Sequence, residues 1–389
     1  MVQTGLERLL YSDFKQIKNQ KLGLLSNQAS TASDLVHGRF HLEREFPGQL
    51  QCLLSPQHGF FAEKQDNMIE SAHQLDPLTG LKVYSLYGES RKPSREMFDQ
   101  FDVLLIDIVD VGTRVYTFLY SMGYCLEMAA MTGKKVIILD RPNPIGGKGV
   151  EGNLLEPEWT SFVGLYPLPM RHGMTFGELA LYINDVCGIA ADLEIIEMTG
   201  WKRSMLFRDS GLPWVFPSPN MPTPETALVY PGQVIWEGTT VSEGRGTTLP
   251  FELVGAPYWN LPAIQKRLKN SYLPGCYLRP VVFEPTSGKY GGETCNGFHL
   301  HITDAATFRP YKTSLALWQA VMHTHQEEFG YKHPPYEYEF VRLPMDLILG
   351  SQRIRKDVEK GKPIDEIESE WQGDLATFLD IRDNYLIYS

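Results

Sequence analysis

Long hydrophobic runs are missing from this chain of 389 residues. No apolar stretch approaches the roughly 20 residues that a membrane-spanning helix needs, so we expect no membrane insertion. The N-terminal residues MVQTGLERLLYSDF lack the basic start and the apolar core of a secretory signal peptide. We therefore expect a cytoplasmic protein, and the alternative is an exported protein whose leader has been removed.

Cysteine and positive charge are also scarce. The five cysteines are widely spaced and form no CxxC pair, which argues against a disulfide framework and a zinc ribbon. His299 and His301 share one face of an expected strand, but no third ligand accompanies them, so we expect no metal. The net charge is -11 and no dense Lys/Arg tract occurs, so we expect no nucleic-acid partner.

Several motifs of nucleotide and acyl chemistry are absent. The sequence contains neither a GxSxG elbow nor a Walker A loop. Residues 147–152, GKGVEG, match GxGxxG literally, but they follow DRPNPI and lead into NLLEPEW, where no helix begins. A phosphate-binding turn needs a helix N-terminus at that point, so we expect no dinucleotide and no other cofactor.

What the chain does contain is material for a large core, with 43% hydrophobic and 12% aromatic residues. In the first half, short and nearly apolar runs predict parallel strands covered on both faces. A helical pattern that ends at Gly133 joins the last two of them. Such βαβ units predict an α/β fold with a Rossmann-like parallel sheet. The strands are expected at residues 21–27, 50–56, 82–88, 101–108 and 134–140.

The sequence changes character near residue 200. Residues 213–224 contain five prolines, which predict a stiff, shaped loop around Asn220. The alternative interpretation of this loop is a strut between domains. Strand-like and helical segments alternate again beyond it. We therefore predict a Rossmann-like domain over residues 1–200 and a smaller C-terminal α/β domain over residues 201–389.

Polar residues follow each of the first-half strands. In open α/β sheets, ligands bind outside the carboxyl ends of the strands, so these residues predict a site on one rim. A purely structural sheet would need turn formers there, but not so many acids, arginines and tyrosines. The rim residues are His58, Glu63, Glu89, Asp107, Asp110, Arg114, Tyr116, Asp140, Arg141 and Asn143.

Glu63 follows two aromatic residues, Phe60 and Phe61. A carboxyl group held against apolar rings loses hydration, which raises its pKa and suits it to act as a general acid in glycosidic cleavage. The alternative is an ordinary acid in the first turn of a helix. Asp107 and Asp110 are candidates for a second carboxylate, or else simple strand-end acids.

Two further segments carry candidate binding residues. Arg171 and His172 precede a helix that Thr175 is expected to cap, and a plain capping turn is the alternative. Glu243 and Arg245 lie in a glycine-rich loop, SEGRGTT, where a ligand could approach the backbone closely. A plain hairpin loop is equally consistent with that pattern.

Eight sequence blocks in a fixed order resemble one bacterial family over nearly the whole chain. They include GLLSNQAS, LLSPQHGFFAE, LDRPNPIGG, PLPMRHGMTFGEL, PSPNMPTPETALVYPG and SEGRGTTLPFELVGAP. The family is that of the exo-acting β-N-acetylmuramidases (NamZ). The resemblance implies a Rossmann-like domain, a smaller C-terminal domain, a site in the cleft between them, and Glu63 as the catalytic residue.

The resemblance also implies an activity in peptidoglycan turnover. Such a glycoside hydrolase releases N-acetylmuramic acid (MurNAc) from the non-reducing end of MurNAc-GlcNAc fragments. The lactyl carboxylate of MurNAc calls for a cation, and Arg114, Arg171 and Arg245 are the candidates. The second catalytic group stays open between Asp107, Asp110, Glu89 and the acetamido group of the substrate. A non-catalytic muropeptide-binding protein is the alternative function.

The two loops beyond residue 200 are expected to close the site. Exo-action requires a wall that blocks sugars beyond the terminal one. We predict that Asn220 and Arg245 supply this wall and face Glu63 across one cleft between the domains.

Overall fold

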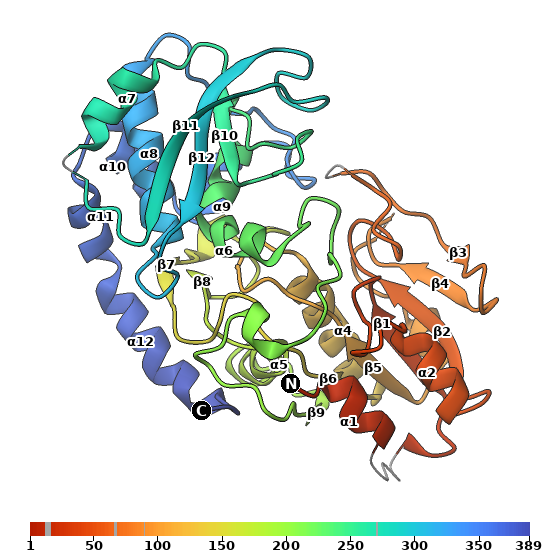
Figure 1. The fold of residues 1–389 in the computed structure, drawn as a ribbon. Helices are drawn as coiled ribbons and strands as arrows, with labels where there is room; N and C mark the ends of the chain where they lie inside the picture. The colour runs from red at the N-terminus through yellow and green to blue at the C-terminus, as the bar shows by residue number, and fades with distance from the viewer. Residues whose placement is uncertain (12–16, 66–67, 89, 270) are drawn as a thin grey trace.

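The computed structural model describes residues 1–11, 17–65, 68–88, 90–269 and 271–389. Glu89, one of the predicted substrate-binding residues, lies outside these described ranges. Figure 1 shows a sheet-centred N-terminal part beside a C-terminal part in which helices and a small sheet pack together. The predicted α/β class and the Rossmann-like sheet are confirmed.

The large sheet has seven strands in the order β3-β4-β2-β1-β5-β6-β9. All neighbours pair in parallel except β3 and β4, which are antiparallel. The order reverses on the two sides of β1, which lies between β2 and β5, as in Rossmann-like folds. The strands are β1 (Leu22–Ser26), β2 (Leu50–Ser55), β3 (Gln74–Leu75), β4 (Lys82–Ser85), β5 (Val103–Asp107), β6 (Lys135–Leu139) and β9 (Asp192–Ile196).

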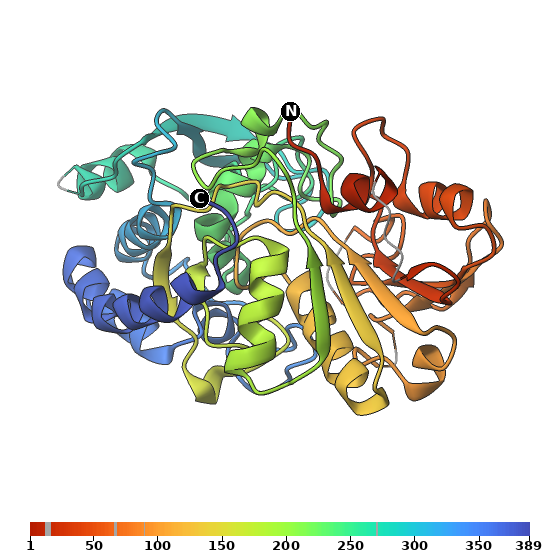
Figure 2. The ribbon, with the colours of Figure 1, turned by 90° about the horizontal axis from the view of Figure 1, so that it is seen from below.

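Successive strand residues point to opposite faces, and different helices cover the two faces. On one face, Leu24 and Leu53 pack with α1 and α2. On the other, Leu25 and Leu54 belong to the cluster that holds α3, α4 and α5 (Figure 2). The helices are α1 (Gly5–Tyr11), α2 (Gly38–Glu45), α3 (Arg95–Phe98), α4 (Phe118–Thr132) and α5 (Phe176–Val186).

The helix caps follow the predicted signals. Gly133 ends α4 in the left-handed conformation with φ 66°, and its N–H donates to the carbonyl of Ala129. Thr175 and Glu178 form a reciprocal capping box at the start of α5. Helix α4 begins at Phe118, because residues 113–117 form a turn that leads from β5 to the helix.

The C-terminal part builds on a three-stranded antiparallel sheet, β10-β12-β11. Helix α8 packs against α6 and α7, and α12 returns to contact β7 of the two-stranded sheet β7-β8. The elements are β7 (Glu151–Leu154), β8 (Pro169–Arg171), α6 (Pro224–Gln233), η4 (Val234–Gly238), β10 (Leu253–Ala256), α7 (Leu261–Leu268), β11 (Cys276–Phe283), β12 (Cys295–Ile302), α8 (Pro310–Thr324), α9 (Pro344–Leu349), α10 (Gln352–Glu359), α11 (Ile364–Glu370) and α12 (Gln372–Arg382).

One hydrophobic cluster joins the two parts. It runs from Leu25 in β1 through α4 and α5 to Trp236, Trp318 and Phe378. The chain ends also meet, since Val2 clusters with Trp201, against which Tyr388 packs. A division of the chain at residue 200 stays a prediction. In the described part of the chain, no helix has the length and apolar character needed to cross a membrane.

Candidate active site

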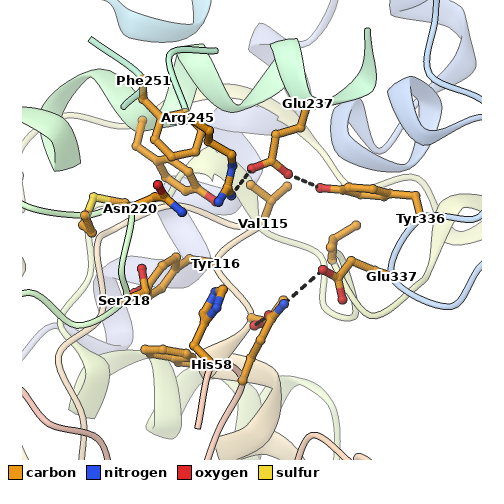
Figure 3. Close-up of a pocket in the computed structure, with 16 residues that line it drawn as sticks. His58, Val115, Tyr116, Ser218, Asn220, Glu237, Arg245, Phe251, Tyr336 and Glu337 are labelled. Atoms are coloured by element: carbon orange, nitrogen blue, oxygen red, sulfur yellow. Dashed lines mark hydrogen bonds and ion pairs between the residues drawn. The ribbon is translucent and has the colours of Figure 1, made fainter. Parts of the chain in front are cut away.

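A small, polar pocket lies where the two parts meet (Figure 3). Its volume is about 30 Å³, enough for one or two water molecules. Segments that follow strands β2 and β5 form one wall, and the C-terminal part forms the other. The lining residues are Gln57, His58, Val115, Tyr116, Thr117, Phe118, Val163, Ser218, Asn220, Met221, Tyr230, Glu237, Arg245, Phe251, Tyr336 and Glu337.

The sheet topology explains why these segments meet. Strands β2 and β5 flank β1, where the strand order reverses. Crossovers on the two sides of this reversal run to opposite faces, which leaves a crevice beyond the carboxyl ends of the strands. Gln57 and His58 leave β2 at this point, and Val115 to Phe118 close the turn after β5.

His58 anchors the loop that follows β2. Its backbone is left-handed, with φ 73°, and its ring Nδ1 lies 2.8 Å from the carbonyl of Lys64. The N–H of Lys64 donates in return to the carbonyl of His58 at 3.2 Å. Burial lowers the pKa of His58 to about 4, so the imidazole is neutral at pH 7. The pocket therefore contains a neutral ring at its N-terminal wall.

Glu237 is a buried, ionised carboxylate opposite His58. Arg245 donates to its Oε1 at 2.7 Å, and the Tyr336 hydroxyl donates to its Oε2 at 2.7 Å. Burial alone would raise the pKa of Glu237, but the charge and hydrogen bond of Arg245 hold it below the ordinary value. Arg245 also lies 3.4 Å from Glu243 and over the ring of Phe251.

Glu337 is a second buried carboxyl group in the same pocket. Gln57 donates to its Oε1 at 3.0 Å and the Tyr87 hydroxyl to its Oε2 at 2.6 Å. Burial raises the pKa of Glu337, and these two donors only partly offset that effect. The pocket thus holds two carboxyl groups whose environments move their pKa values in opposite directions, an arrangement that separates acid and base roles.

Four of the residues predicted from sequence line this pocket: His58, Tyr116, Asn220 and Arg245. Tyr116 is buried, and burial raises its pKa, so its phenol stays protonated. Asn220 donates from Nδ2 to the carbonyl of Gln65 at 3.0 Å. This bond links the proline-rich loop directly to the loop that carries Glu63.

Glu63 itself is solvent-exposed, so its expected burial against aromatic rings is wrong. Phe60 is buried in the hydrophobic cluster that packs α1 and α2 against one face of the large sheet. The Glu63 carboxylate folds back over Gly59 and accepts the N–H of Phe61 at 3.3 Å. Along the chain it lies between His58, which lines the pocket, and Gln65, which accepts a hydrogen bond from Asn220, but Glu63 is not itself a lining residue. Its catalytic role stays a prediction.

Asp107 and Arg141, both predicted as rim residues, form a buried ion pair with each other. Both oxygens of Asp107 bind the guanidinium, which also donates to the carbonyl of Thr31. Asp107 does not line the pocket, and its ion pair joins the ends of β5 and β6.

Asp110 and His172 lie together behind the pocket wall. Asp110 Oδ2 accepts the N–H of Gly112 at 2.7 Å and lies 3.5 Å from His172 Nε2. His172 is completely buried, and its Nδ1 accepts the N–H of Met174. These contacts shape the turn after β5, and neither side chain lines the pocket.

Arg114 is fully buried and does not face a ligand site, which corrects its predicted role. Its guanidinium donates to four backbone carbonyls, at 2.8–3.1 Å. These carbonyls belong to Asn153, Leu168, Ile348 and Leu349. The guanidinium satisfies the hydrogen-bonding capacity of these buried carbonyls where three segments meet. Because the side chain is fully buried there, it offers no surface to a substrate carboxylate.

The remaining predicted residues are also structural. Asp140 accepts hydrogen bonds at the start of α5 from Thr175, Gly177 and Tyr388, and burial raises its pKa to about 6. Asn143 bridges its own turn to the carbonyl of Met174.

Arg171 and Glu243 lie away from the pocket as well. Arg171 donates to the carbonyl of Ile145 and borders a separate cavity that includes Lys148 and Arg309. Glu243 binds Arg245 and accepts from Lys289 Nζ at 2.8 Å. Glu243 therefore supports Arg245 from behind, rather than meeting a ligand itself.

Sequence reasoning missed Glu237, Tyr336 and Glu337. Glu237 follows Trp236 in an otherwise apolar stretch, VIWEG, and a lone acid in such a stretch was the available signal. Tyr336 and Glu337 lie in a different loop, residues 334–339 (PPYEYE), which does not follow a predicted strand. Only the packing of the C-terminal part brings them to the pocket.

Within the described ranges, no group of three His, Cys, Asp or Glu side chains is placed to hold a metal ion. The rings of His299 and His301 instead contact each other, and both lie within hydrogen-bond distance of the guanidinium of Arg279 on the neighbouring strand β11.

Fold and pocket together define a two-part α/β protein with a small polar site, between its parts, that carries two carboxyl groups. Two family models match nearly the whole chain: exo-β-N-acetylmuramidase NamZ, N-terminal, over residues 22–225, and its C-terminal counterpart over residues 228–388. The chain belongs to this family of glycoside hydrolases. The family and enzyme class inferred from sequence are thereby confirmed.

Known relatives agree with this membership. The chain is 42% identical over 388 residues to peptidoglycan β-N-acetylmuramidase NamZ of Bacillus subtilis, covering all of this chain and 91% of that protein. It is also similar to crystal structures of two DUF1343 family proteins from Bacteroides fragilis. Their TM-scores are 0.88 and 0.74, at 31% and 29% identity, covering 100% of this chain and 99% of each of theirs.

Proposed function

We propose that this chain is an exo-acting β-N-acetylmuramidase that releases MurNAc from the non-reducing end of peptidoglycan-derived MurNAc-GlcNAc fragments. The main observation is that Glu237 and Glu337, whose pKa values shift in opposite directions, share one small pocket with His58 and Tyr116 from the other part of the chain. A small pocket suits the binding of one terminal sugar. The family membership and the name of the Bacillus subtilis relative support the substrate.

Glu63 is the proposed general acid. The loop that carries Glu63 contacts both sides of the site. His58, at its start, lines the pocket and bonds Lys64, and Gln65, at its end, accepts a hydrogen bond from Asn220 in the proline-rich loop of residues 213–224. In this proposal Glu63 protonates the leaving oxygen of a terminal sugar that is bound in the pocket.

Glu237 is the proposed second carboxylate, because Arg245 keeps it ionised inside the pocket. A fixed negative charge stabilises the positive charge that develops at the anomeric carbon during glycoside cleavage. Arg245 is also the proposed reader of the lactyl carboxylate. Its Nη1 is buried without a hydrogen-bond partner among the described residues, which leaves one donor for a ligand.

The pocket must open to admit a sugar ring, since its volume is about 30 Å³. Because one hydrophobic cluster joins the two parts, the space for the sugar must come from movement of the side chains and loops that line the pocket.

Substitution of the two acids tests this assignment. Glu63→Gln and Glu237→Gln should each lower kcat on MurNAc-GlcNAc by about 10²–10⁴-fold, the usual contribution of general acid–base catalysis. Free MurNAc is detected by chromatography, and calorimetric titration checks that the variants still bind the disaccharide. Glu96→Gln, at an exposed position on α3, is the matched control and should keep wild-type turnover.

Contrary results have distinct meanings. If Glu63→Gln retains more than about a third of the wild-type rate, the general acid is another group. If the wild-type protein binds MurNAc-GlcNAc but releases no MurNAc, the chain is a muropeptide-binding protein and the proposed activity is wrong.

A further inference from the structure

A second cavity lies apart from the active-site pocket. It is lined by residues of β7, β8 and α12 and by the segment that precedes α8, and it shares no described lining residue with the pocket. Its volume is about 560 Å³, which is in the usual range for small-molecule sites. The cavity therefore has the size of a ligand site, and the proposed hydrolysis makes no use of it.

Arg171, on β8, is the buried cation of this cavity. Its side chain lines the cavity although the residue is only 7% exposed. One guanidinium nitrogen donates to the carbonyl of Ile145, but Nε is buried without a hydrogen-bond partner among the described residues. A buried cation that is incompletely paired is costly, so an anion in the cavity would stabilise it.

Glu151, on β7, is the acid nearest in charge to Arg171, and other groups already occupy it. Its two carboxylate oxygens accept the N–H of Tyr311 at 3.3 Å and the N–H of Lys312 at 2.8 Å, at the start of α8. Burial raises the pKa of Glu151 to about 7, so this carboxyl group is only partly ionised at neutral pH. Glu151 is therefore an incomplete countercharge for Arg171.

Two further cations line the same cavity. Lys148 and Arg309 are both exposed, on opposite sides of Arg171 in the sequence. The charge of Arg309 lowers the pKa of Arg171, which means that the two guanidinium groups repel each other. Three cations thus share the cavity with one partly ionised carboxyl group, and an anion between them would relieve the repulsion.

The glycine-rich segment of residues 147–152, GKGVEG, forms one wall of the cavity. A Cβ at Gly149 would lie 2.3 Å from Cζ of Arg171, so the guanidinium packs directly on the backbone there. Strand β7 begins at Glu151, where a dinucleotide fingerprint would have a helix. The segment therefore positions cationic side chains and does not form a phosphate-binding turn of its own.

We propose that this cavity binds a small phosphate monoester, with its phosphate group among Arg171, Lys148 and Arg309. A phosphate monoester carries about two negative charges at pH 7, which match the excess of cations better than the single charge of a carboxylate does. Arginine also binds phosphate oxygens with two parallel hydrogen bonds. Apolar surface from Pro274, Phe308 and Leu379 is available to the organic group of the ligand.

Calorimetric titration with phenyl phosphate tests the proposal without any assay of hydrolysis, so the result is independent of the proposed function. The matched probes are benzoate, with one negative charge, and benzyl alcohol, with none. We expect phenyl phosphate to bind with a Kd of about 1 mM or tighter, and the other two at least about tenfold more weakly.

Substitutions locate the binding site. Arg171→Met should weaken phenyl phosphate binding by at least about tenfold. Because Arg171 is buried, the double variant Lys148→Met/Arg309→Met, at exposed positions, repeats the test without disturbing the core and should show a similar loss. Lys266→Met, at an exposed lysine of α7, and Arg245→Met, in the active-site pocket, are the controls and should bind phenyl phosphate as the wild type does.

Three results would overturn the proposal. The first is the absence of saturable binding of phenyl phosphate up to about 10 mM. The second is equal affinity for phenyl phosphate and for benzoate or benzyl alcohol, which would show that the charge of the phosphate is not recognised. The third is a loss of binding in Arg245→Met with wild-type binding in the folded double variant, which would place the phosphate in the active-site pocket.

Discussion

Arg245 and Tyr336 stabilise the ionised form of Glu237, and the hydrogen bond from Tyr336 can be removed by a single substitution. The Tyr336 hydroxyl donates to Oε2 of Glu237 at 2.7 Å and helps to hold the pKa of this carboxyl below its ordinary value. Without that donor the ionised form is less stable, so the pKa of Glu237 rises. If the ionised form is the active one, activity is then lost at a higher pH as the medium is acidified.

We therefore predict that Tyr336→Phe moves the acid limb of the kcat/KM profile upward by about one pH unit, because a hydrogen bond to a charged group contributes ~1.5–3 kcal/mol and one unit equals 1.36 kcal/mol. The neighbouring Tyr338 bonds the Glu70 carboxylate instead, so Tyr338→Phe should leave that limb in place. An unmoved limb in Tyr336→Phe would mean that Glu237 does not control the acid side of the profile.

Among single residues, the sequence predicted those pocket residues that directly follow a strand. His58 and Tyr116 follow β2 and β5, and strand ends are readable from apolar runs. It misassigned Arg114 and Asp107, because sequence shows a charge but not its partners. Arg114 faces four carbonyls and Asp107 faces Arg141, and each of these partners is distant in sequence.

At the scale of the elements, the Arg114 side chain holds the turn after β5 against three other segments. Its guanidinium joins the end of β7, the segment before β8 and the end of α9 through carbonyl groups. Arg114→Met would leave these carbonyls buried without donors, and each costs ~1–3 kcal/mol. We predict a fall of about 3 kcal/mol or more in the free energy of unfolding, measured by denaturant titration.

The control for this prediction is Arg95→Met, at an exposed arginine of α3, which should change the free energy of unfolding by less than about 0.5 kcal/mol. A similarly small change in Arg114→Met would show that water or movement of the backbone satisfies the carbonyl groups. It would also reopen Arg114 as a residue available to ligands.

For the whole molecule, the hydrophobic cluster that crosses from the N-terminal to the C-terminal part has a thermodynamic consequence. The boundary between the two family models, at residues 225–228, cuts through this cluster. Neither part can bury its apolar surface alone. We predict a single unfolding transition in scanning calorimetry, with a calorimetric-to-van't Hoff enthalpy ratio near one.

A piece that ends at residue 226 should in turn fail to give a cooperative transition. Two well-separated transitions in the intact protein, or cooperative unfolding of that piece, would contradict this expectation. They would show that the interface between the parts is not a continuous core.

The sequence by itself determined the class of fold, the parallel strands, several helix caps and the family, because each is written in local patterns of apolar spacing, capping residues and contiguous motifs. Tertiary structure decided which charged groups meet. Glu237, Tyr336 and Glu337 reach the pocket only because the C-terminal part packs over the rim of the sheet. Hydrogen bonds and ion pairs act over a few ångströms in space, and no spacing along the chain encodes them.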